Sequence, residues 1–233
     1  NGTQFLGNLG YCNIAFGVCT LFNNTTGCHN VSMGYYTLYC NTTGSHNLAI
    51  GYYGLRNNSI GIHNNAQGYQ ALKCNTTGNH NLAVGCNALC GNTTGSYNIG
   101  KGAGSLFTNS TGSYNIGLGS CSIYYSNGNS CNVGVGYRSL YCSISYGNVG
   151  IGVNAGSCIC GGMKNTIIGN QILGDQAMSC TLLLGAGGGE RIRSDNLGCI
   201  CISTYPFLGC LANNRSEEHT SELQSLAYLV CRL

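Results

Sequence analysis

Cysteine has the most obvious chemistry in this 233-residue chain, because 17 copies could form disulfides, hold a metal or remain free thiols. Cys40, Cys74 and Cys142 recur at one phase of a 17-residue period but lie two or four periods apart. Strands stack about 4.8 Å apart, so this spacing is too wide for a disulfide. Zinc sites usually carry C-x₂₋₄-C spacing. The close pairs here are C-x-C pairs, Cys158/Cys160 and Cys199/Cys201. We expect scattered free thiols, with a metal site and local or interchain disulfides as the alternatives.

Four histidines keep the same period, and two tyrosines continue their series: His29, His46, His63, His80, Tyr97 and Tyr114. Stacked imidazoles could bind a metal, but repeats stacked in register place them along a line and not around a point. We therefore predict a ladder of rings on the surface, with a metal-binding ladder as the alternative. No cofactor is expected.

Five tyrosines in three successive repeats form the candidate receptor- or glycan-binding site: Tyr35, Tyr36, Tyr52, Tyr53 and Tyr69. Tyrosine rings stack on sugar faces and are enriched in interfaces. The same stripe would also stiffen a stack of repeats through contacts between rings. The sequence leaves both interpretations open.

Acidic residues are absent before Asp175, which removes the carboxylates that most hydrolytic sites need. Neither a pair of carboxylates nor a Ser-His-Asp set can be built from the repeats. The Gly-rich segment 100–104 matches a phosphate-binding loop poorly and is not followed by a helical pattern. We expect no enzymatic activity.

Basic residues are sparse in the same region, which holds only Arg56, Lys73, Lys101, Arg138 and Lys164. Nucleic-acid binding needs clustered Lys and Arg, so no nucleic-acid partner is expected. A weak attraction to anionic glycans is compatible with these charges. No apolar run reaches the roughly 18 residues of a membrane span, so we expect no span in this chain.

The element that would position these residues follows from the period itself. An Asn followed by a short apolar run and a Gly recurs every 17 residues, with one step of 16 residues. The repeat asparagines are Asn13, Asn30, Asn47, Asn64, Asn81, Asn98, Asn115, Asn132, Asn148 and Asn165. A unit of 17 residues cannot bury an apolar face alone, so neighbouring units must stack. The pattern predicts an all-β chain, a parallel β-roll (β-solenoid) of about ten coils.

Apolar residues occupy the first, third and eighth positions after the repeat Asn, as in Leu48, Ile50 and Leu55. Side chains two apart on a strand share a face, so we predict that these three positions form the core. The small second position, such as Ala49, is then expected on the opposite face, where it would let another chain approach closely.

This assignment of the core also predicts weak points in the stack. Asn65, Gln67 and Lys101 occupy first or third positions. As polar residues in core positions, they are expected to loosen the coils that contain them.

Two glycine series mark the corners of each coil, one at the end of the strand, such as Gly34, and one after an Asn-Thr-Thr turn, such as Gly44. Glycine tolerates positive φ, so we expect positive φ in both series. The turns also create N-x-S/T sequons. Their number is weak support for glycosylation, because the repeat itself requires this turn.

The segments 47–55 and 81–89 read Asn-hydrophobic-Ala-Ile/Val-Gly followed by Leu four residues later. This motif resembles the head repeats of YadA-like trimeric autotransporter adhesins, and the Asn-Thr-Thr-Gly arrays resemble phage and giant-virus tail-fibre-like proteins even more closely. The resemblance covers residues 8 to about 175 and implies a left-handed β-roll packed as a homotrimer. It implies a virion tail fibre or a bacterial cell surface as the location, and attachment to a host receptor or glycan as the function.

Three regions are expected: a β-roll array at 1–175, a transition at 176–214 toward a fibre region that this sequence lacks, and a non-native tail at 215–233. Residues 182–211, which include Glu190-Arg-Ile-Arg-Ser-Asp195, resemble the segment that ends such arrays in tail fibres. The last 19 residues lack Gly and are rich in charge, unlike the rest of the chain, and they resemble one reading frame of a sequencing adapter.

Two other functions use comparable folds. Left-handed β-helix acyltransferases need a six-residue sub-period and a catalytic His, whereas this sequence has a 17-residue period and a histidine ladder. Ice-binding β-solenoids present Thr-x-Thr on a flat strand face, whereas the Thr pairs here are adjacent, as in Thr42-Thr43. The fibre or adhesin segment is the function that the sequence favours.

Overall fold

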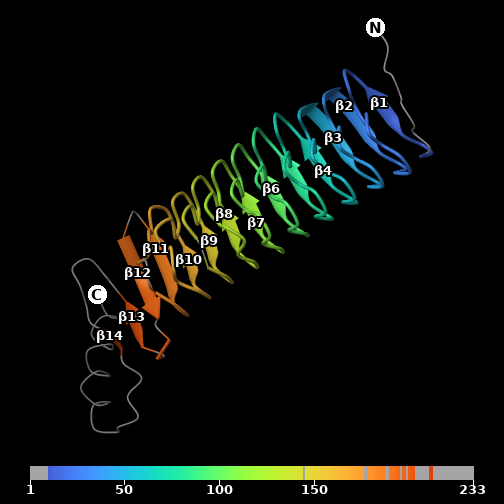
Figure 1. Ribbon diagram of the computed structural model, residues 1–233. Coiled ribbons are helices and arrows are strands. Elements are labelled where there is room, and N and C mark those ends of the chain that lie inside the picture. The colour runs from blue at the N-terminus through green and yellow to red at the C-terminus, as the bar shows by residue number, and fades with distance from the viewer. Residues whose placement is uncertain are drawn as a thin grey trace.

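The computed structural model describes residues 10–143, 145–175, 178–186, 189–194, 196–197, 199–202 and 210–211. The described chain winds into a rod of stacked coils, with one strand in each coil (Figure 1). The strands are β1 (Ile14–Phe16), β2 (Val31–Tyr35), β3 (Leu48–Tyr52), β4 (Asn65–Gln67), β5 (Leu82–Val84), β6 (Ile99–Lys101), β7 (Ile116–Leu118), β8 (Val133–Val135), β9 (Val149–Ile151), β10 (Thr166–Ile168), β11 (Leu182–Ala186), β12 (Gly189–Ser194), β13 (Ile200–Ile202) and β14 (Cys210–Leu211). None of the described segments forms an apolar helix of membrane-spanning length.

Strands β1 to β11 are parallel and pair in sequence order, so each coil lies directly on the one before it. Val31 pairs with Leu48 and Met33 with Ile50, each partner being 17 residues further along the chain. The single 16-residue step leaves this register intact, because Val133 pairs with Val149. The predicted all-β solenoid of 17-residue coils is confirmed.

The core is a file of aliphatic side chains from the eighth position of each coil. These side chains are almost completely buried: Leu21, Leu38, Leu55, Leu72, Leu89, Leu106, Ile123 and Leu140. They face the second position of the strands, where Ala49, Ala66 and Ala83 are fully buried. The interior is therefore about one leucine thick.

The predicted sidedness of the strand is wrong. The second position points into the core and not toward another chain, while the first and third positions point outward. Ile50 is 37% exposed and Leu48 is half-buried. The second position is small because the opposite wall is close: a Cβ added at Gly100 would lie 3.2 Å from Leu89 Cγ. Thinness of the core, and not approach of a second chain, accounts for the small residues.

The three predicted weak points, Asn65, Gln67 and Lys101, do not lie in the core, because the first and third positions of the strands point outward. Asn65 and Gln67 lie on the outward face of β4 and hydrogen-bond to each other through Gln67 Nε2 and Asn65 Oδ1 at 3.0 Å. Lys101 is exposed at the end of β6. None of the three interrupts the leucine file.

Near the C-terminal end of the stack a large and a small residue exchange positions across the core, which supports this description. The eighth position after Asn148 is Gly156, and there a leucine side chain is missing from the file. The second position of β10 is the bulky Ile167, which is fully buried. A Cβ added at Gly156 would lie 2.9 Å from Ile167 Cδ1. Volume lost on one wall is thus replaced from the other, as close packing of protein interiors requires.

Two ladders of buried asparagine fasten the corners of the coils. The repeat Asn at position 47 donates from Nδ2 to Gly61 O (2.8 Å), and its Oδ1 accepts the backbone N–H of Asn64 (2.9 Å). The second ladder runs through the Asn of the Asn-Thr-Thr turn. Asn58 Nδ2 donates to Asn41 Oδ1 at 2.8 Å and to Gly61 O at 2.9 Å. Because buried polar groups must be paired, these ladders fix the register of the stack.

Glycine is required in the two series for different physical reasons. Gly34, Gly51 and Gly68 have φ of 138°, 123° and 135°, as predicted. The series containing Gly44 is not in the positive-φ region, so that prediction is wrong. A Cβ at Gly44 would lie 2.4 Å from Asn41 Oδ1 and 2.5 Å from Gly61 O, so close stacking against the asparagine ladder excludes a side chain there.

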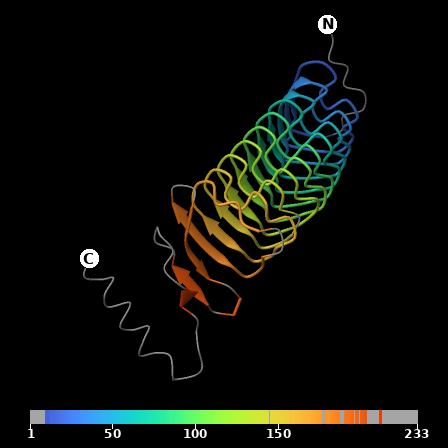
Figure 2. The ribbon, with the colours of Figure 1, turned by 90° about the vertical axis from the view of Figure 1, so that its left-hand side faces the viewer.

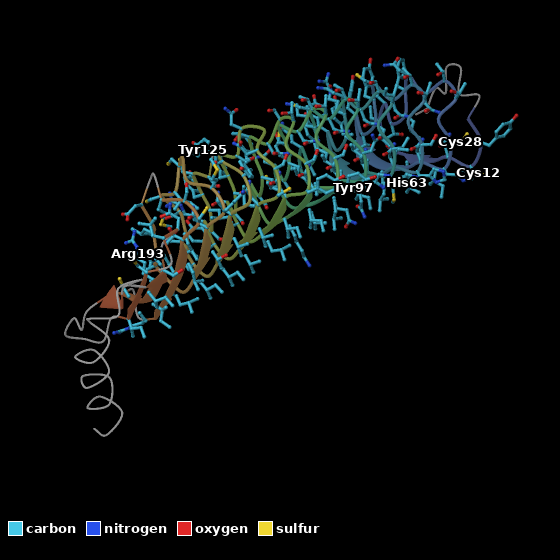
Figure 3. The ribbon with its side chains drawn as sticks, turned by 90° about the horizontal axis from the view of Figure 1, so that it is seen from below. Cys12, Cys28, His63, Tyr97, Tyr125 and Arg193 are labelled. Carbon is cyan, nitrogen blue, oxygen red and sulfur yellow. The ribbon has the colours of Figure 1, made fainter. Side chains whose placement is uncertain are left out.

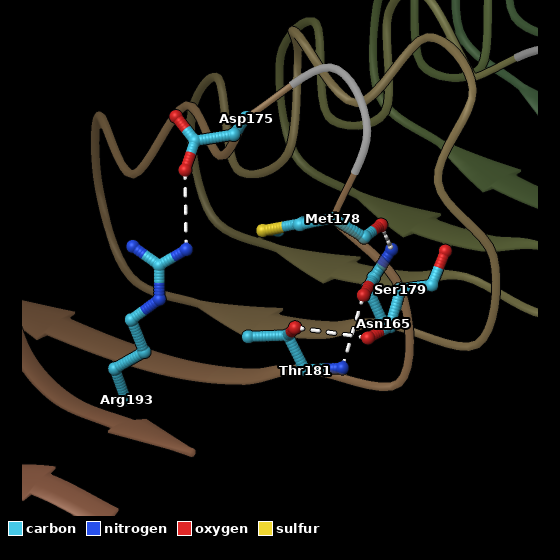
Figure 4. Close-up of polar contacts among 6 residues, drawn as sticks. All are labelled: Asn165, Asp175, Met178, Ser179, Thr181 and Arg193. Carbon is cyan, nitrogen blue, oxygen red and sulfur yellow. Dashed lines mark hydrogen bonds and ion pairs between the residues drawn. The ribbon is translucent and has the colours of Figure 1, made fainter. Parts of the chain in front are cut away.

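The parallel stack extends to β11, and the sheet then continues with antiparallel strands β12 to β14 (Figure 2). The first asparagine ladder, that of the repeat Asn, ends here: Asn165 Nδ2 donates to Met178 O at 2.7 Å, and Asn165 Oδ1 accepts from Thr181 N at 3.0 Å (Figure 4). Arg193 on β12 pairs with Asp175 at 3.1 Å. The change from parallel to antiparallel pairing thus lies between β11 and β12, beyond the expected end of the array at 175 and inside the expected transition region 176–214. The predicted non-native tail at 215–233 lies outside the described residues.

Candidate functional site

The five predicted tyrosines lie together on the N-terminal half of the rod, where three positions of the coil meet. Together with three further residues from the same coils they form what we call the tyrosine surface, which consists of Tyr35, Tyr36, Tyr39, Tyr52, Tyr53, Arg56, Tyr69 and Lys73. Tyr35 and Tyr52 end strands β2 and β3 and pair with each other, and the other residues follow strands β2, β3 and β4, so the register of the sheet places them above one another.

Tyr35, Tyr52 and Tyr69 form the outer file of the tyrosine surface. Each follows the positive-φ glycine that ends the straight part of the coil. Their rings stack with centroids 5.1 and 5.4 Å apart and with interplanar angles of 7° and 11°. The exposed fractions are 40%, 40% and 48%. The predicted stacking of rings between coils is therefore present, and the rings remain partly exposed.

Tyr36 and Tyr53 form a second file beside the first, and both have positive φ, 52° and 59°. Tyr53 lies 4.1 Å from Tyr52 and meets Tyr36 edge-on at 5.9 Å, centroid to centroid. A hydrogen bond with Tyr53 raises the pKa of Tyr52 to about 12. A hydrogen bond with Cys19 raises the pKa of Tyr36. In both contacts the phenol keeps its proton, which is shared with the neighbouring side chain.

The sequence interpretation missed the third file, which is the ninth position of the coil and contains Tyr39, Arg56 and Lys73. Arg56 Cζ lies 5.0 Å from the ring centre of Tyr53 and 6.0 Å from that of Tyr39. Lys73 Nζ lies 5.9 Å from Tyr53. Such distances are those of cation–π contacts. A search of every position of the 17-residue period for basic and aromatic residues would have found this file.

The charges of the tyrosine surface have no carboxylate to balance them, because no Asp or Glu precedes Asp175 in the sequence. Arg56 Nε is buried and has no hydrogen-bond partner among the described residues. The ring faces within the file are covered by the neighbouring rings, so the surface offers phenol hydroxyls, ring edges and two cations. This combination suits an anionic, hydroxyl-rich ligand better than a flat apolar one.

The predicted histidine ladder is a surface ladder. His29, His46, His63 and His80 are exposed and stack with centroids 4.8 Å apart, and Tyr97 continues the stack at 4.8 Å from His80. His63 and Tyr97 lie along one edge of the rod (Figure 3). Zn–N bonds are about 2.0–2.1 Å, and rings stacked in a line do not converge on such a point. No group of three or more potential ligands that could hold a metal is found within the described part of the chain.

The cysteines between Cys12 and Cys180 are free thiols in the described structure, as the sequence indicated, whereas Cys201 is disulfide-bonded. Two pairs in neighbouring coils contact each other. A hydrogen bond with Cys90 lowers the pKa of Cys74 to about 6, and the same bond raises the pKa of Cys90. Cys142 and Cys160 have Sγ atoms 2.7 Å apart. The sequence interpretation compared cysteines only at one phase of the period and so missed both pairs.

The sequon asparagines and the turn threonines form hydrogen bonds within the stack of coils. The buried sequon residues are Asn24, Asn41, Asn75, Asn92 and Asn109, all within the second asparagine ladder. A fully buried Nδ2 that donates hydrogen bonds is not accessible to a glycosyltransferase in the folded chain. Thr42 Oγ1 donates to Ser59 O at 3.1 Å and Thr76 Oγ1 to Thr93 O at 3.1 Å. These hydroxyls link coils and do not form the flat Thr-x-Thr face of an ice-binding surface.

A different outward surface follows strands β1 to β11 and consists of the first and third positions of the coils. Its side chains project from the strands as a row rich in carbon (Figure 3). The most exposed apolar members are Ile14, Phe16, Met33, Ile50, Leu118, Ile151 and Ile168, which are 36–71% exposed. We call this surface the apolar strand face.

Comparison with known proteins gives no relative from which a function could be transferred. No family model matches the chain, and neither a curated protein nor a solved structure is significantly similar to it.

Proposed function

We propose that this chain is a structural segment of an attachment fibre, a viral tail fibre or a bacterial surface adhesin, without catalytic activity. The observation that carries this proposal is that one rod of stacked coils has two outward surfaces, the apolar strand face along β1 to β11 and the tyrosine surface in the coils of β2 to β4. In a rod of stacked coils each coil packs directly on its neighbours. Two binding surfaces on such a rod are therefore held at fixed positions relative to each other.

The apolar strand face supports assembly with further copies of the same chain. Contiguous exposed apolar surface in proteins usually marks an interaction site. A second copy carries the same pattern with the same coil spacing, so apolar positions of the two rods match along their whole length. Gln67 and Lys101 interrupt this pattern, and in register the like charges of Lys101 would weaken the contact in that coil. The resemblance to trimeric adhesins favours three copies around one axis, with the apolar strand faces inward.

The tyrosine surface supports attachment to an anionic glycan. Its outer file starts at Tyr35 and Tyr52, the last residues of β2 and β3, and its second and third files lie beyond the strands. Assembly through the first and third positions of the strands therefore leaves the second and third files accessible. Arg56 and Lys73 supply positive charge without a carboxylate partner, and the phenols of Tyr52 and Tyr53 supply hydroxyls. Sulfate or carboxylate groups of a sugar chain fit this chemistry because charge-assisted hydrogen bonds are the stronger ones.

The experiment that tests attachment compares binding of the full chain to immobilised sulfated, sialylated and neutral oligosaccharides. Binding to an anionic glycan is expected, with an affinity that falls as salt rises. The double variant Tyr53→Ala/Arg56→Gln removes one cation and its ring and is expected to weaken binding by about tenfold or more.

The matched control is Tyr97→Ala, which removes a stacked, exposed ring from the histidine ladder instead. This variant is expected to bind as the unchanged chain does. Equal binding of the neutral and anionic glycans, or equal losses in the two variants, would refute the assignment of the tyrosine surface.

A further inference from the structure

The contact between Cys142 and Cys160 joins two neighbouring coils at the corner where the chain departs from its period. The 16-residue step arises here: Ser126 and Ser143 are 17 residues apart, whereas the Asn that follow them, Asn132 and Asn148, are 16 apart. The corner after Ser143 is therefore one residue shorter than the others.

The second asparagine ladder also ends at this corner. Ser126 Oγ still hydrogen-bonds to Asn109 Oδ1 at 3.2 Å, and Ser143 Oγ accepts from Asn148 Nδ2 at 3.2 Å. The next coil places the buried Ile159 at this position. Isoleucine has no side-chain donor or acceptor, so the ladder that fastens the earlier coils cannot continue to Ile159.

Cys160 directly follows Ile159, and Cys142 directly precedes Ser143. Their Sγ atoms are 2.7 Å apart, and both residues are partly exposed. A disulfide bond is about 2.05 Å long, so less than about 1 Å of approach is needed to close it. We propose that Cys142 and Cys160 are a redox-dependent staple, a disulfide that replaces the missing rung of the asparagine ladder between these two coils.

The oxidant would be a small-molecule disulfide such as oxidised glutathione. Burial raises the pKa of the Cys142 thiol to about 11, which makes Cys142 a poor first nucleophile, so the first attack is assigned to Cys160. It attacks one glutathione sulfur, forms a mixed disulfide and expels one glutathione thiolate. Cys142 then loses its proton and attacks the Cys160 sulfur, and the second glutathione leaves. The protein gives up two electrons and two protons, and one oxidised glutathione becomes two reduced molecules.

The nearby Cys158 provides the matched control. It is exposed, lies two residues from Cys160 and influences the pKa of Cys142. Serine is compatible with position 142, because Asn57 and Thr108 occupy the same position in other coils. We therefore compare three variants that hardly change the packing. The staple is removed in Cys142→Ser and Cys160→Ser and kept in Cys158→Ser.

The test treats the full chain and the three variants with oxidised glutathione and maps the disulfides by mass spectrometry after digestion with chymotrypsin. Cleavage at Tyr141 and Tyr146 separates Cys142 from the other two cysteines, so a staple appears as two linked peptides. The link is expected in the unchanged chain and in Cys158→Ser, and it is expected to be absent from Cys142→Ser and Cys160→Ser. Reduction with dithiothreitol should release it.

Hydrogen exchange gives a second readout that does not depend on peptide mapping. A disulfide that closes a short loop is expected to slow amide exchange in segment 142–160 on the order of a hundredfold. Linkage mainly through Cys158, linkage in Cys160→Ser as fast as in the unchanged chain, or no linkage at all would overturn the proposal.

Discussion

Replacement of Asn75 by alanine tests the physical basis of the stack more sharply than any core substitution. Asn75 is fully buried. Its Nδ2 donates to Asn58 Oδ1 at 2.7 Å and to Gly78 O at 3.0 Å, and its Oδ1 accepts from Asn92 Nδ2 at 2.8 Å. Alanine removes all three hydrogen bonds. Asn58 Oδ1 then loses its donor, and Asn92 Nδ2 loses one acceptor. Gly78 O keeps the hydrogen bond from Asn64 Nδ2 at 2.8 Å.

The magnitude follows from the two groups that lose a partner. Each buried polar group left unsatisfied costs about 1–3 kcal/mol. Asn75→Ala is therefore expected to lower the free energy of unfolding by about 2–6 kcal/mol, a large share of a typical domain's stability. Urea unfolding followed by circular dichroism measures the loss. Hydrogen exchange should locate it in the coils that contain Asn58, Asn75 and Asn92, because coils interact only with their neighbours.

Two companion variants separate the ladder from simple loss of a side chain. Asn57→Ala changes a partly exposed neighbour and is expected to cost no more than about 0.5 kcal/mol. Asn75→Asp places a carboxylate oxygen beside Asn58 Oδ1 and Gly78 O, so the folded state disfavours its ionised form and its pKa is raised. Its stability is expected to be highest below the unfolded pKa of about 4 and to fall as pH rises. Equal losses for Asn75→Ala and Asn57→Ala, or an Asn75→Asp variant that is most stable at neutral pH, would refute the reasoning.

Further predictions concern the core, the thiols and the phenols. Leu72→Ala is expected to cost about 2–5 kcal/mol because Leu72 is fully buried, whereas Leu82→Ala on the apolar strand face should cost about 1 kcal/mol in the unassembled chain; similar values in urea unfolding would contradict the sidedness described for the strands. Cys74 is expected to react with iodoacetamide with a pH midpoint near 6, and Cys90→Ala should move the midpoint upward because the hydrogen bond is lost. A midpoint near that of an ordinary thiol would be inconsistent with this contact. Tyr52 should ionise near pH 12 in a phenolate absorbance titration, and Tyr53→Phe should lower that value; an unchanged titration would exclude the hydrogen bond between them.

The period of the sequence was sufficient to predict the architecture, because registry alone determines which residues stack. Asn residues every 17 positions require the same contact in every coil, and the ladders through Asn47 and Asn58 are the result. The predicted file of Leu38, Leu55 and Leu72 is present for the same reason. The tyrosines grouped from their phase in the period are also brought together.

The sidedness of the strand could not be predicted from hydrophobicity. Leu48 and Ile50 are more apolar than Ala49, yet the alanine is the buried residue. The reason is the thickness of the coil: the leucine at the eighth position fills the interior and leaves room for only a small residue opposite. A sequence read one coil at a time contains no information on the distance between the two walls.

The partners of the site were missed where they depend on the three-dimensional shape of the corner. Arg56 and Lys73 lie in a different position of the coil from the tyrosines they contact. Cys142 and Cys160 lie at different positions of the coil, one before and one after the corner that is one residue short. Comparison within a single position of the period detects neither arrangement.

The mass of the assembled protein in solution tests the proposed function most directly. Sedimentation equilibrium of the full chain is expected to give three times the 24.3 kDa of one chain. Leu82→Lys, which places a charge on the apolar strand face, should shift the assembly toward single chains, while Tyr53→Ala should leave it unchanged. A single chain at every concentration, or an assembly that Leu82→Lys does not weaken, would contradict a fibre built on that face.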